Sequence, residues 1–175
     1  LKNEYPQLGG NYEVVHHSEF LEHLIDTGKL DIRNASLEDR ITYHDSCYLG
    51  RHNDVYMAPR KIVGSIKGVQ IVEMPRNGTQ GMCCGAGGAR MWMEESIGTK
   101  VNDERAQEAI STGASRVATA CPFCYIMLDD GVKAAGKEET DVKVADIAIH
   151  LLDALENGER NLANQNAPLA TSAGE

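Results

Sequence analysis

Hydrophobic and polar positions alternate in two ways along the chain. Short runs rich in β-branched residues predict strands, and stretches with apolar residues three or four positions apart predict helices. The strand candidates are Val14-Val15, Ile41-Thr42-Tyr43, the run 69–72 and the run 116–120. Because helical patterns separate most of these runs, we expect an α/β fold with a small, mainly parallel sheet flanked by helices.

The helical patterns have clear starting signals. Helices are expected after Pro59, over 98–111, from Cys121-Pro122 and after a capping Asp146. The stretch 98–111 is the most polar of them, so we expect it to lie on the surface. From Gly158 onward the sequence has little to bury, and it predicts a disordered tail. The chain is therefore divided into a domain over 1–157 and a disordered C-terminal tail over 158–175.

Size and charge exclude some classes of function. The chain has 175 residues and a formal net charge of −9, which argues against nucleic-acid binding or a polybasic membrane surface. No apolar run approaches the ~20 residues that a membrane span needs, and the first residues lack the apolar segment of a secretory signal. We expect a cytoplasmic protein with protein or small-molecule partners. Because Leu1 is not an initiator methionine, we also expect a fragment of a longer polypeptide.

Five cysteines form the most informative pattern in the sequence. There are 35 residues between the first cysteine and an adjacent pair, 36 between that pair and the fourth, and two between the last two. Each group follows a strand candidate, and parallel strands place their carboxyl ends at one edge of a sheet. We therefore expect the three groups to meet in one pocket. The five are Cys47, Cys83, Cys84, Cys121 and Cys124.

The spacing favours a metal centre or redox chemistry over disulfides. An odd number of cysteines in a reducing compartment does not form a disulfide framework. A CxxC at a helix start gains from the helix dipole, which lowers a thiol pKa. Adjacent cysteines are awkward for one tetrahedral ion, but they can bind different irons of a cluster. The run 85–88 is rich in glycine, which lets the backbone approach such a cluster and direct N–H groups at its sulfur atoms.

Three segments resemble a known family. The stretch 43–51, the Cys83-Cys84-Gly85 triplet and the motif Cys121-Pro122-Phe123-Cys124 are similar to those of the CCG, or cysteine-rich, domain. This family includes the B-type subunits of heterodisulfide reductases and the iron–sulfur subunits of glycolate, lactate and glycerol-3-phosphate oxidoreductases. The resemblance covers about residues 1 to 156. Such domains typically occur in pairs, and this sequence resembles the second, C-terminal copy.

The resemblance implies a cofactor and its ligands. In the best understood members, all five cysteines of a copy hold a noncubane four-iron (4Fe-4S) cluster. Carried over to this sequence, the ligands are the five cysteines, and Gly85 of the CCG triplet belongs to the cluster-binding site. Ser46 departs from the family pattern, because proline is expected before the first cysteine. This departure removes no ligand.

The resemblance also implies an activity and partners. The chain is expected to be a domain or subunit of an oxidoreductase that is not active alone, relaying electrons between a flavoprotein or ferredoxin-type donor and quinone or a disulfide. Its first partner would be a CCG copy upstream in the full-length chain. Similarity to membrane-linked iron–sulfur proteins implies association with the cytoplasmic face of a membrane through upstream segments.

Other interpretations stay open at this stage. Zinc needs only four of the five thiolates, so the main alternative is a zinc-stabilised structural or interaction domain without redox activity. A metal-free dithiol at Cys121 and Cys124 leaves the other three cysteines unexplained. His44 and Asp45 lie beside the first cysteine, where a role in fixing the loop competes with a hydrogen bond to a ligating sulfur or a proton relay. Three apolar residues over 91–93 follow the glycine run, where shielding of the site and ordinary packing explain them equally well.

Overall fold

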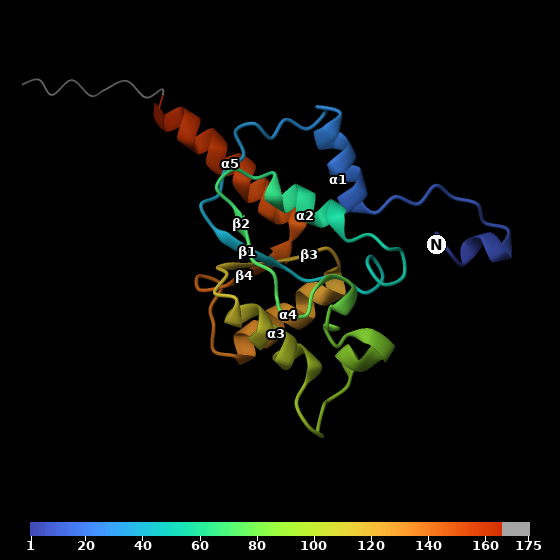
Figure 1. Cartoon of the computed structure of the whole chain (residues 1–175). Coiled ribbons are helices and arrows are strands. Elements are labelled where there is room, and N and C mark those ends of the chain that lie inside the picture. The colour runs from blue at the N-terminus through green and yellow to red at the C-terminus, as the bar shows by residue number, and fades with distance from the viewer. Residues whose placement is uncertain (166–175) are drawn as a thin grey trace, which may run out of the picture.

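The computed structural model describes residues 1–165 and places four parallel strands in one sheet within them (Figure 1). The strands are β1 (Arg40–Tyr43), β2 (Gln70–Ile71), β3 (Arg116–Thr119) and β4 (Lys143–Asp146). Their order across the sheet is β2-β1-β3-β4. In the pairing register, Ile41 of β1 lies opposite Ile71 on one side and Arg116 on the other. The expected α/β class and parallel sheet are confirmed.

Helices cover both faces of this sheet. Figure 1 shows α1 (His17–Asp26), α2 (Met57–Gly64) and α5 (Ile147–Gln165) on one side, and α3 (Val101–Ser111) and α4 (Pro122–Ala134) on the other. Short 3-10 turns lie in the connecting segments. They are η1 (Tyr5–Leu8), η2 (Gly78–Gln80) and η3 (Gly87–Trp92).

The alternation of side chains along the strands divides the core into two layers. Ile41 and Ala118 pack with the apolar residues of α2 and α5, whereas Val117 and Val144 pack with those of α3 and α4. Neighbouring residues on a strand point to opposite faces, so each short strand supports both layers. The helix α3 is less superficial than its polarity predicts, because Arg105 on it is fully buried.

Strand order fixes the place where a site can form. The chain passes from β1 through α2 to β2 on one side, and from β3 through α4 to β4 on the other. The connections therefore diverge between β1 and β3, which makes this boundary the topological switch point of the sheet. Loops that leave the carboxyl ends of these two strands separate and open a crevice. Two of the three cysteine groups lie on those loops.

Two elements differ from the sequence predictions. Val14 and Val15 do not form a strand, because the sheet offers them no partner and the chain enters α1 two residues later. The sequence analysis missed α1, which begins with His16 as a capping residue, and it missed the short strand β4. Strand β4 is flanked by charged residues, so its apolar core of Val144 and Ala145 is too short to detect from pattern alone.

The predicted tail over 158–175 begins too early. Helix α5 continues to Gln165, and the remaining residues 166–175 lie outside the described part of the chain. Tertiary contacts stabilise this end: Asn157 donates a side-chain hydrogen bond to the Ser36 carbonyl (2.9 Å). A Cβ added at Gly158 would lie 1.8 Å from the Asn34 carbonyl oxygen. A polar, weakly hydrophobic sequence is thus helical because the backbone of another segment packs against it.

This close approach predicts the effect of Gly158→Ala. Helix propensity alone would favour alanine by about 1 kcal/mol, but the clash with the Asn34 backbone should reverse the sign and destabilise the fold by roughly 1–3 kcal/mol. Denaturant unfolding under anaerobic conditions measures the change. Glu159→Ala, at the next and exposed position, is the matched control and should be nearly neutral. Equal or greater stability of Gly158→Ala would contradict the packing described for α5.

Candidate functional site

All five cysteines line one cavity of about 470 Å³ at the carboxyl end of the sheet. Each of them is a free thiol. Cys47 follows β1, Cys83 and Cys84 follow β2, and Cys121 and Cys124 follow β3. The structure thus brings together the three cysteine groups that the sequence separates by more than thirty residues. Parallel pairing explains this convergence, since it places the three strand ends side by side.

The loop that carries Cys47 is a compact turn. The backbone N–H groups of Leu49 and Gly50 donate to the Ser46 carbonyl (3.1 and 2.9 Å). Ser46 is itself buried and lines the cavity. Its hydroxyl has no hydrogen-bond partner among the described residues. Serine at this position therefore keeps a well-formed loop and leaves a buried polar group beside the thiols.

The vicinal pair lies on the segment that connects β2 to α3. Arg51 donates to the Gly81 carbonyl (2.5 Å), which ties this segment to the Cys47 loop. Gly85 has a φ of +89°, and its N–H donates to the Cys83 sulfur (3.3 Å). A Cβ at Gly85 would also meet Val101 at 3.1 Å, at the start of α3. Gly85 does not line the cavity itself, so its role is to shape the backbone around Cys83.

Cys121 and Cys124 occupy the first turn of α4. Cys121 is the N-terminal capping residue, Pro122 takes the first helical position, and Cys124 is buried. A hydrogen bond with the Cys124 thiol lowers the pKa of Cys121 to about 6, and the backbone N–H groups of Cys124 and Phe123 add to this effect against the penalty of burial. The start of α4 therefore favours a thiolate, as the CxxC motif predicts.

The other thiols share few protons. A hydrogen bond with Cys124 lowers the pKa of Cys84 to about 4 despite burial, and His44 contributes in the same direction. The same contacts raise the pKa of Cys124, because it supplies the proton to both Cys121 and Cys84. Burial and the neighbouring Cys83 raise the pKa of Cys47 to about 11. Sulfurs packed this closely repel one another as thiolates, so a bound cation would relieve a repulsion that protons relieve in its absence.

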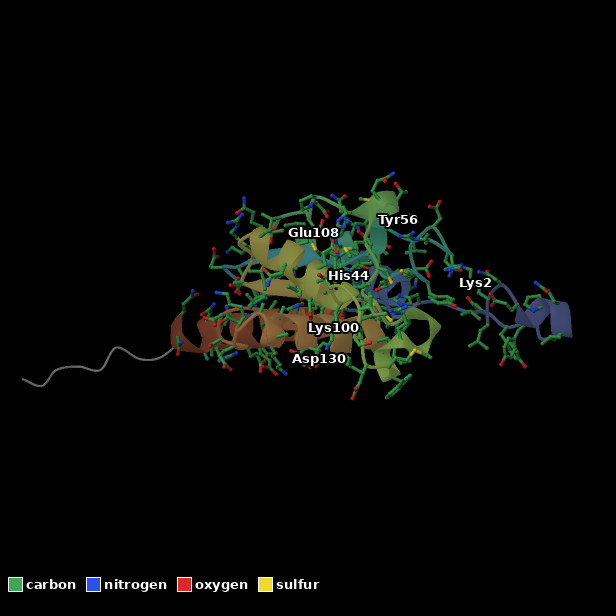
Figure 2. The ribbon with its side chains drawn as sticks, turned by 90° about the horizontal axis from the view of Figure 1, so that it is seen from below. Lys2, His44, Tyr56, Lys100, Glu108 and Asp130 are labelled. Atoms are coloured by element: carbon green, nitrogen blue, oxygen red, sulfur yellow. The ribbon has the colours of Figure 1, made fainter. Side chains whose placement is uncertain are left out.

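His44 is part of this group. One of its ring nitrogens lies within 4.8 Å of the sulfurs of Cys84 and Cys124, and those two sulfurs lie within the same distance of each other. The histidine is fully buried at the end of β1, and its Nδ1 accepts a hydrogen bond from Nε of Arg105 (3.1 Å). Figure 2 shows His44 inside the outline of the molecule. The sequence indicated His44, but nothing in a polar surface helix indicated Arg105.

Asp45, the neighbour of His44, fixes the loops rather than the thiols. Arg60 of α2 donates to both Asp45 carboxylate oxygens (2.7 and 3.0 Å) and to Glu73 beyond β2 (2.7 Å). The Gly78 N–H also donates to Asp45 (2.6 Å). One buried carboxylate thus links the Cys47 loop to the segment that leads to the vicinal pair. This is the loop-fixing role weighed for Asp45 in the sequence, and Arg60 is the partner that pattern alone could not identify.

Other residues of the sequence analysis take ordinary positions. His16 lines the cavity, caps α1 and lies 3.2 Å from the Ala120 carbonyl through Nε2. Met91 and Trp92 also line the cavity, whereas Met93 does not. His52 stacks on Tyr48 with ring centroids 4.6 Å apart. The cavity wall is therefore largely apolar outside the cysteines.

Fold and site together define a class: an α/β domain with five thiols gathered at the switch point of a parallel sheet. Residues 41–129 match the cysteine-rich domain family, CCG. The match covers more than half of the chain, and the chain belongs to this family. The matched range begins at β1 and ends within α4, so it contains all the cysteines.

Three relatives carry related sequences. The chain is 49% identical over 147 residues to a probable iron-sulfur-binding oxidoreductase, FadF, of Bacillus subtilis, covering 84% of the chain and 21% of the relative. It is 47% identical over 163 residues to an EtfAB:quinone oxidoreductase of Syntrophomonas wolfei, covering 89% and 22%. It is 38% identical over 157 residues to one subunit of a dihydromethanophenazine:CoB–CoM heterodisulfide reductase of Methanosarcina acetivorans, covering 88% and 37%. The chain thus spans well under half the length of these relatives.

The Asp45–Arg60 pair predicts a large effect of Arg60→Met. Loss of the guanidinium leaves Asp45 buried and unpaired, which should reduce the free energy of unfolding by roughly 3–5 kcal/mol. Faster alkylation of Cys47 should accompany it, because the Cys47 loop loses its tie to α2. Arg33→Met is the matched control, since Arg33 pairs with Asp31 at an exposed site, and it should change neither measurement. Similar stability of both variants would show that the buried pair does not hold the loop.

Proposed function

We propose that this chain is the iron–sulfur electron-transfer domain of an oxidoreductase, with the five cysteines as ligands of a 4Fe-4S cluster. The observation that carries the proposal is the convergence of five free thiols in one cavity. A single tetrahedral ion uses at most four of them. Iron–sulfur clusters are held by thiolates, and a cluster has several irons among which adjacent cysteines can be divided.

The residues around the thiols fit such a group. Buried polar atoms without a partner among the described residues are rare in proteins, and two of them occur here, the Ser46 hydroxyl and Nε2 of His44. Both residues lie on the loop that leads to Cys47. Negatively charged cluster sulfur accepts hydrogen bonds, so it would satisfy donors that the protein alone leaves unsatisfied. The pattern of low and high thiol pKa values also fits a site whose protons are displaced by a cation.

A cluster bound here would accept and release single electrons. The protein residues would hold it through Cys47, Cys83, Cys84, Cys121 and Cys124, with a noncubane arrangement proposed for the vicinal pair. Gly85 would bind indirectly, by shaping the backbone at Cys83. The apolar wall that includes Met91 and Trp92 would limit the access of water, and solvent exposure is one of the factors that set a cluster potential.

The mouth of the cavity supports a further protein partner. Tyr48, Trp92 and Phe123 line it and are 76%, 78% and 51% exposed. Contiguous exposed aromatic side chains are typical of protein interfaces. We propose that a first CCG copy of the full-length protein covers this mouth, and that electrons pass between a flavoprotein or ferredoxin-type donor and quinone or a disulfide.

The location of the domain is a proposal that extends to the whole protein. We propose that the domain works on the cytoplasmic side and that segments outside this chain attach it to a membrane. The similarity to relatives such as the EtfAB:quinone oxidoreductase supports this arrangement. Within residues 1–165, none of the helices combines the length and the hydrophobicity required to cross a bilayer.

Metal analysis is the first test of the proposed function. The protein is purified without oxygen, and iron, acid-labile sulfide and zinc are measured together with visible absorption and EPR spectra. We expect about four irons and four sulfides per chain for one 4Fe-4S cluster, with broad charge-transfer absorption. Stoichiometric zinc without iron, under conditions that load clusters, would instead establish the zinc-stabilised domain and refute the redox role.

Single cysteine substitutions are the second test. If all five thiolates are ligands, each Cys→Ser variant should lose most of its iron or change its EPR spectrum, and Cys84→Ser should be as damaging as Cys121→Ser. Ser115→Ala, at a residue outside the cavity, is the control and should leave iron content unchanged. A four-thiolate site makes the opposite prediction, because one of the five variants would then behave as wild type.

A further inference from the structure

Two fully buried histidines of this chain have nearly identical surroundings on one side of the ring. Nδ1 of His44 lies 3.1 Å from Nε of Arg105, and Nδ1 of His150 lies 3.3 Å from a guanidinium nitrogen of Arg116. They differ on the other side. Nε2 of His150 lies 3.3 Å from the Val117 carbonyl oxygen, an ordinary hydrogen-bond acceptor. Nε2 of His44 has no such partner among the described residues.

The contact with Arg105 determines where the His44 ring carries its proton. A guanidinium remains protonated and only donates hydrogen bonds, so Nδ1 of His44 must accept with its lone pair. The ring proton of the imidazole then resides on Nε2. Because Nδ1 is occupied, Nε2 is the nitrogen left for the nearby sulfurs of Cys84 and Cys124. An N–H group in this position can donate to sulfur, but it cannot coordinate a metal ion.

We propose that His44 donates a hydrogen bond through Nε2 to the thiolates of Cys84 and Cys124, and that Arg105 is the positioning residue that holds it in this role. This inference rests on the proposed function, in which those thiolates hold an iron–sulfur cluster. Hydrogen bonds to ligating sulfur withdraw electron density and favour the reduced, more negative state of a cluster. The His44–Arg105 pair therefore raises the potential of the centre without contributing a ligand.

Arg105 is built into the fold in a way that suits this role. It is fully buried, and one guanidinium nitrogen donates to both the Arg76 carbonyl (2.8 Å) and Glu108 (2.9 Å). These bonds fix the direction of Nε toward His44. The remaining nitrogen of the guanidinium is buried without a partner in residues 1–165. A purely structural arginine would more easily direct that group to solvent, so its burial behind His44 indicates that the fold tolerates a cost to keep this geometry.

Potential measurements and spectroscopy test the pair in the cluster-loaded chain. Wild type is compared with His44→Leu, which removes the donor, and His44→Gln, whose amide can still donate. His150→Gln is the matched control, because it alters the equivalent buried histidine that faces a carbonyl. The measurements are the midpoint potential from an EPR-monitored titration and the hyperfine coupling of an exchangeable proton to the reduced cluster in H₂O and D₂O.

The expected result is a more negative potential in His44→Leu, with loss of the exchangeable-proton coupling. His44→Gln should retain part of both, and His150→Gln should match wild type. Arg105→Met should shift the potential in the same direction as His44→Leu, and circular dichroism establishes whether it is folded. A potential and proton coupling unchanged in His44→Leu, at full iron content, would overturn the inference while leaving the proposed function intact.

Direct ligation by His44 is a separate outcome that would also overturn the inference. Protein labelled with ¹⁵N-histidine would then show a strong nitrogen coupling to the cluster, and both His44 variants would lose iron while His150→Gln kept it. The proposed function fails in a different way, since wild type itself would then take up no iron or sulfide. The experiments therefore separate an incorrect role for His44 from an incorrect cofactor.

Discussion

The whole arrangement depends on one constraint, the parallel pairing of β1 with β3 in a sheet of order β2-β1-β3-β4. Strands that run in the same direction end at the same edge, and connections that diverge between β1 and β3 leave a crevice there. The Cys47 loop and the Cys121 turn leave the two strands that flank this crevice. The vicinal pair reaches it from β2, beside β1. A β-hairpin in place of any parallel pair would have sent one cysteine group to the opposite edge.

Convergence of thiols is costly for the fold, and the surrounding contacts show how that cost is met. Sulfurs this close compete for protons, which is why the pKa of Cys84 falls while that of Cys124 rises. The loops that carry them are held by a buried ion pair between Asp45 and Arg60 and by the capped first turn of α4. These contacts do not involve the thiols, so the loops are positioned by the protein, and bound metal would add its binding energy to an arrangement already formed.

Much of this was predictable from sequence, for identifiable reasons. The cysteines follow strands with strong β-branched character, so their meeting at one edge followed from a correct reading of β1 and β3. Strand β4 and the end of α5 were not predictable, because their stability comes from tertiary contacts: β4 pairs with β3, and Gly158 packs on the Asn34 carbonyl. The site was incomplete for a similar reason. Arg60 and Arg105 lie on helices far from any cysteine in sequence, and a charged residue on a polar helix predicts exposure.

Arg105 also shows how a site can be adjusted independently of its ligands. The thiols come from loops at the sheet edge, whereas Arg105 belongs to α3, which contacts His44 from the opposite helical layer. A substitution on that face of α3 could alter the proton position on His44 without disturbing a cysteine or a strand. Domains with the same five cysteines could thus differ in potential through residues that a cysteine motif does not include. Similarity in the ligands therefore carries less information about the redox role than the identity of the buried donors behind them.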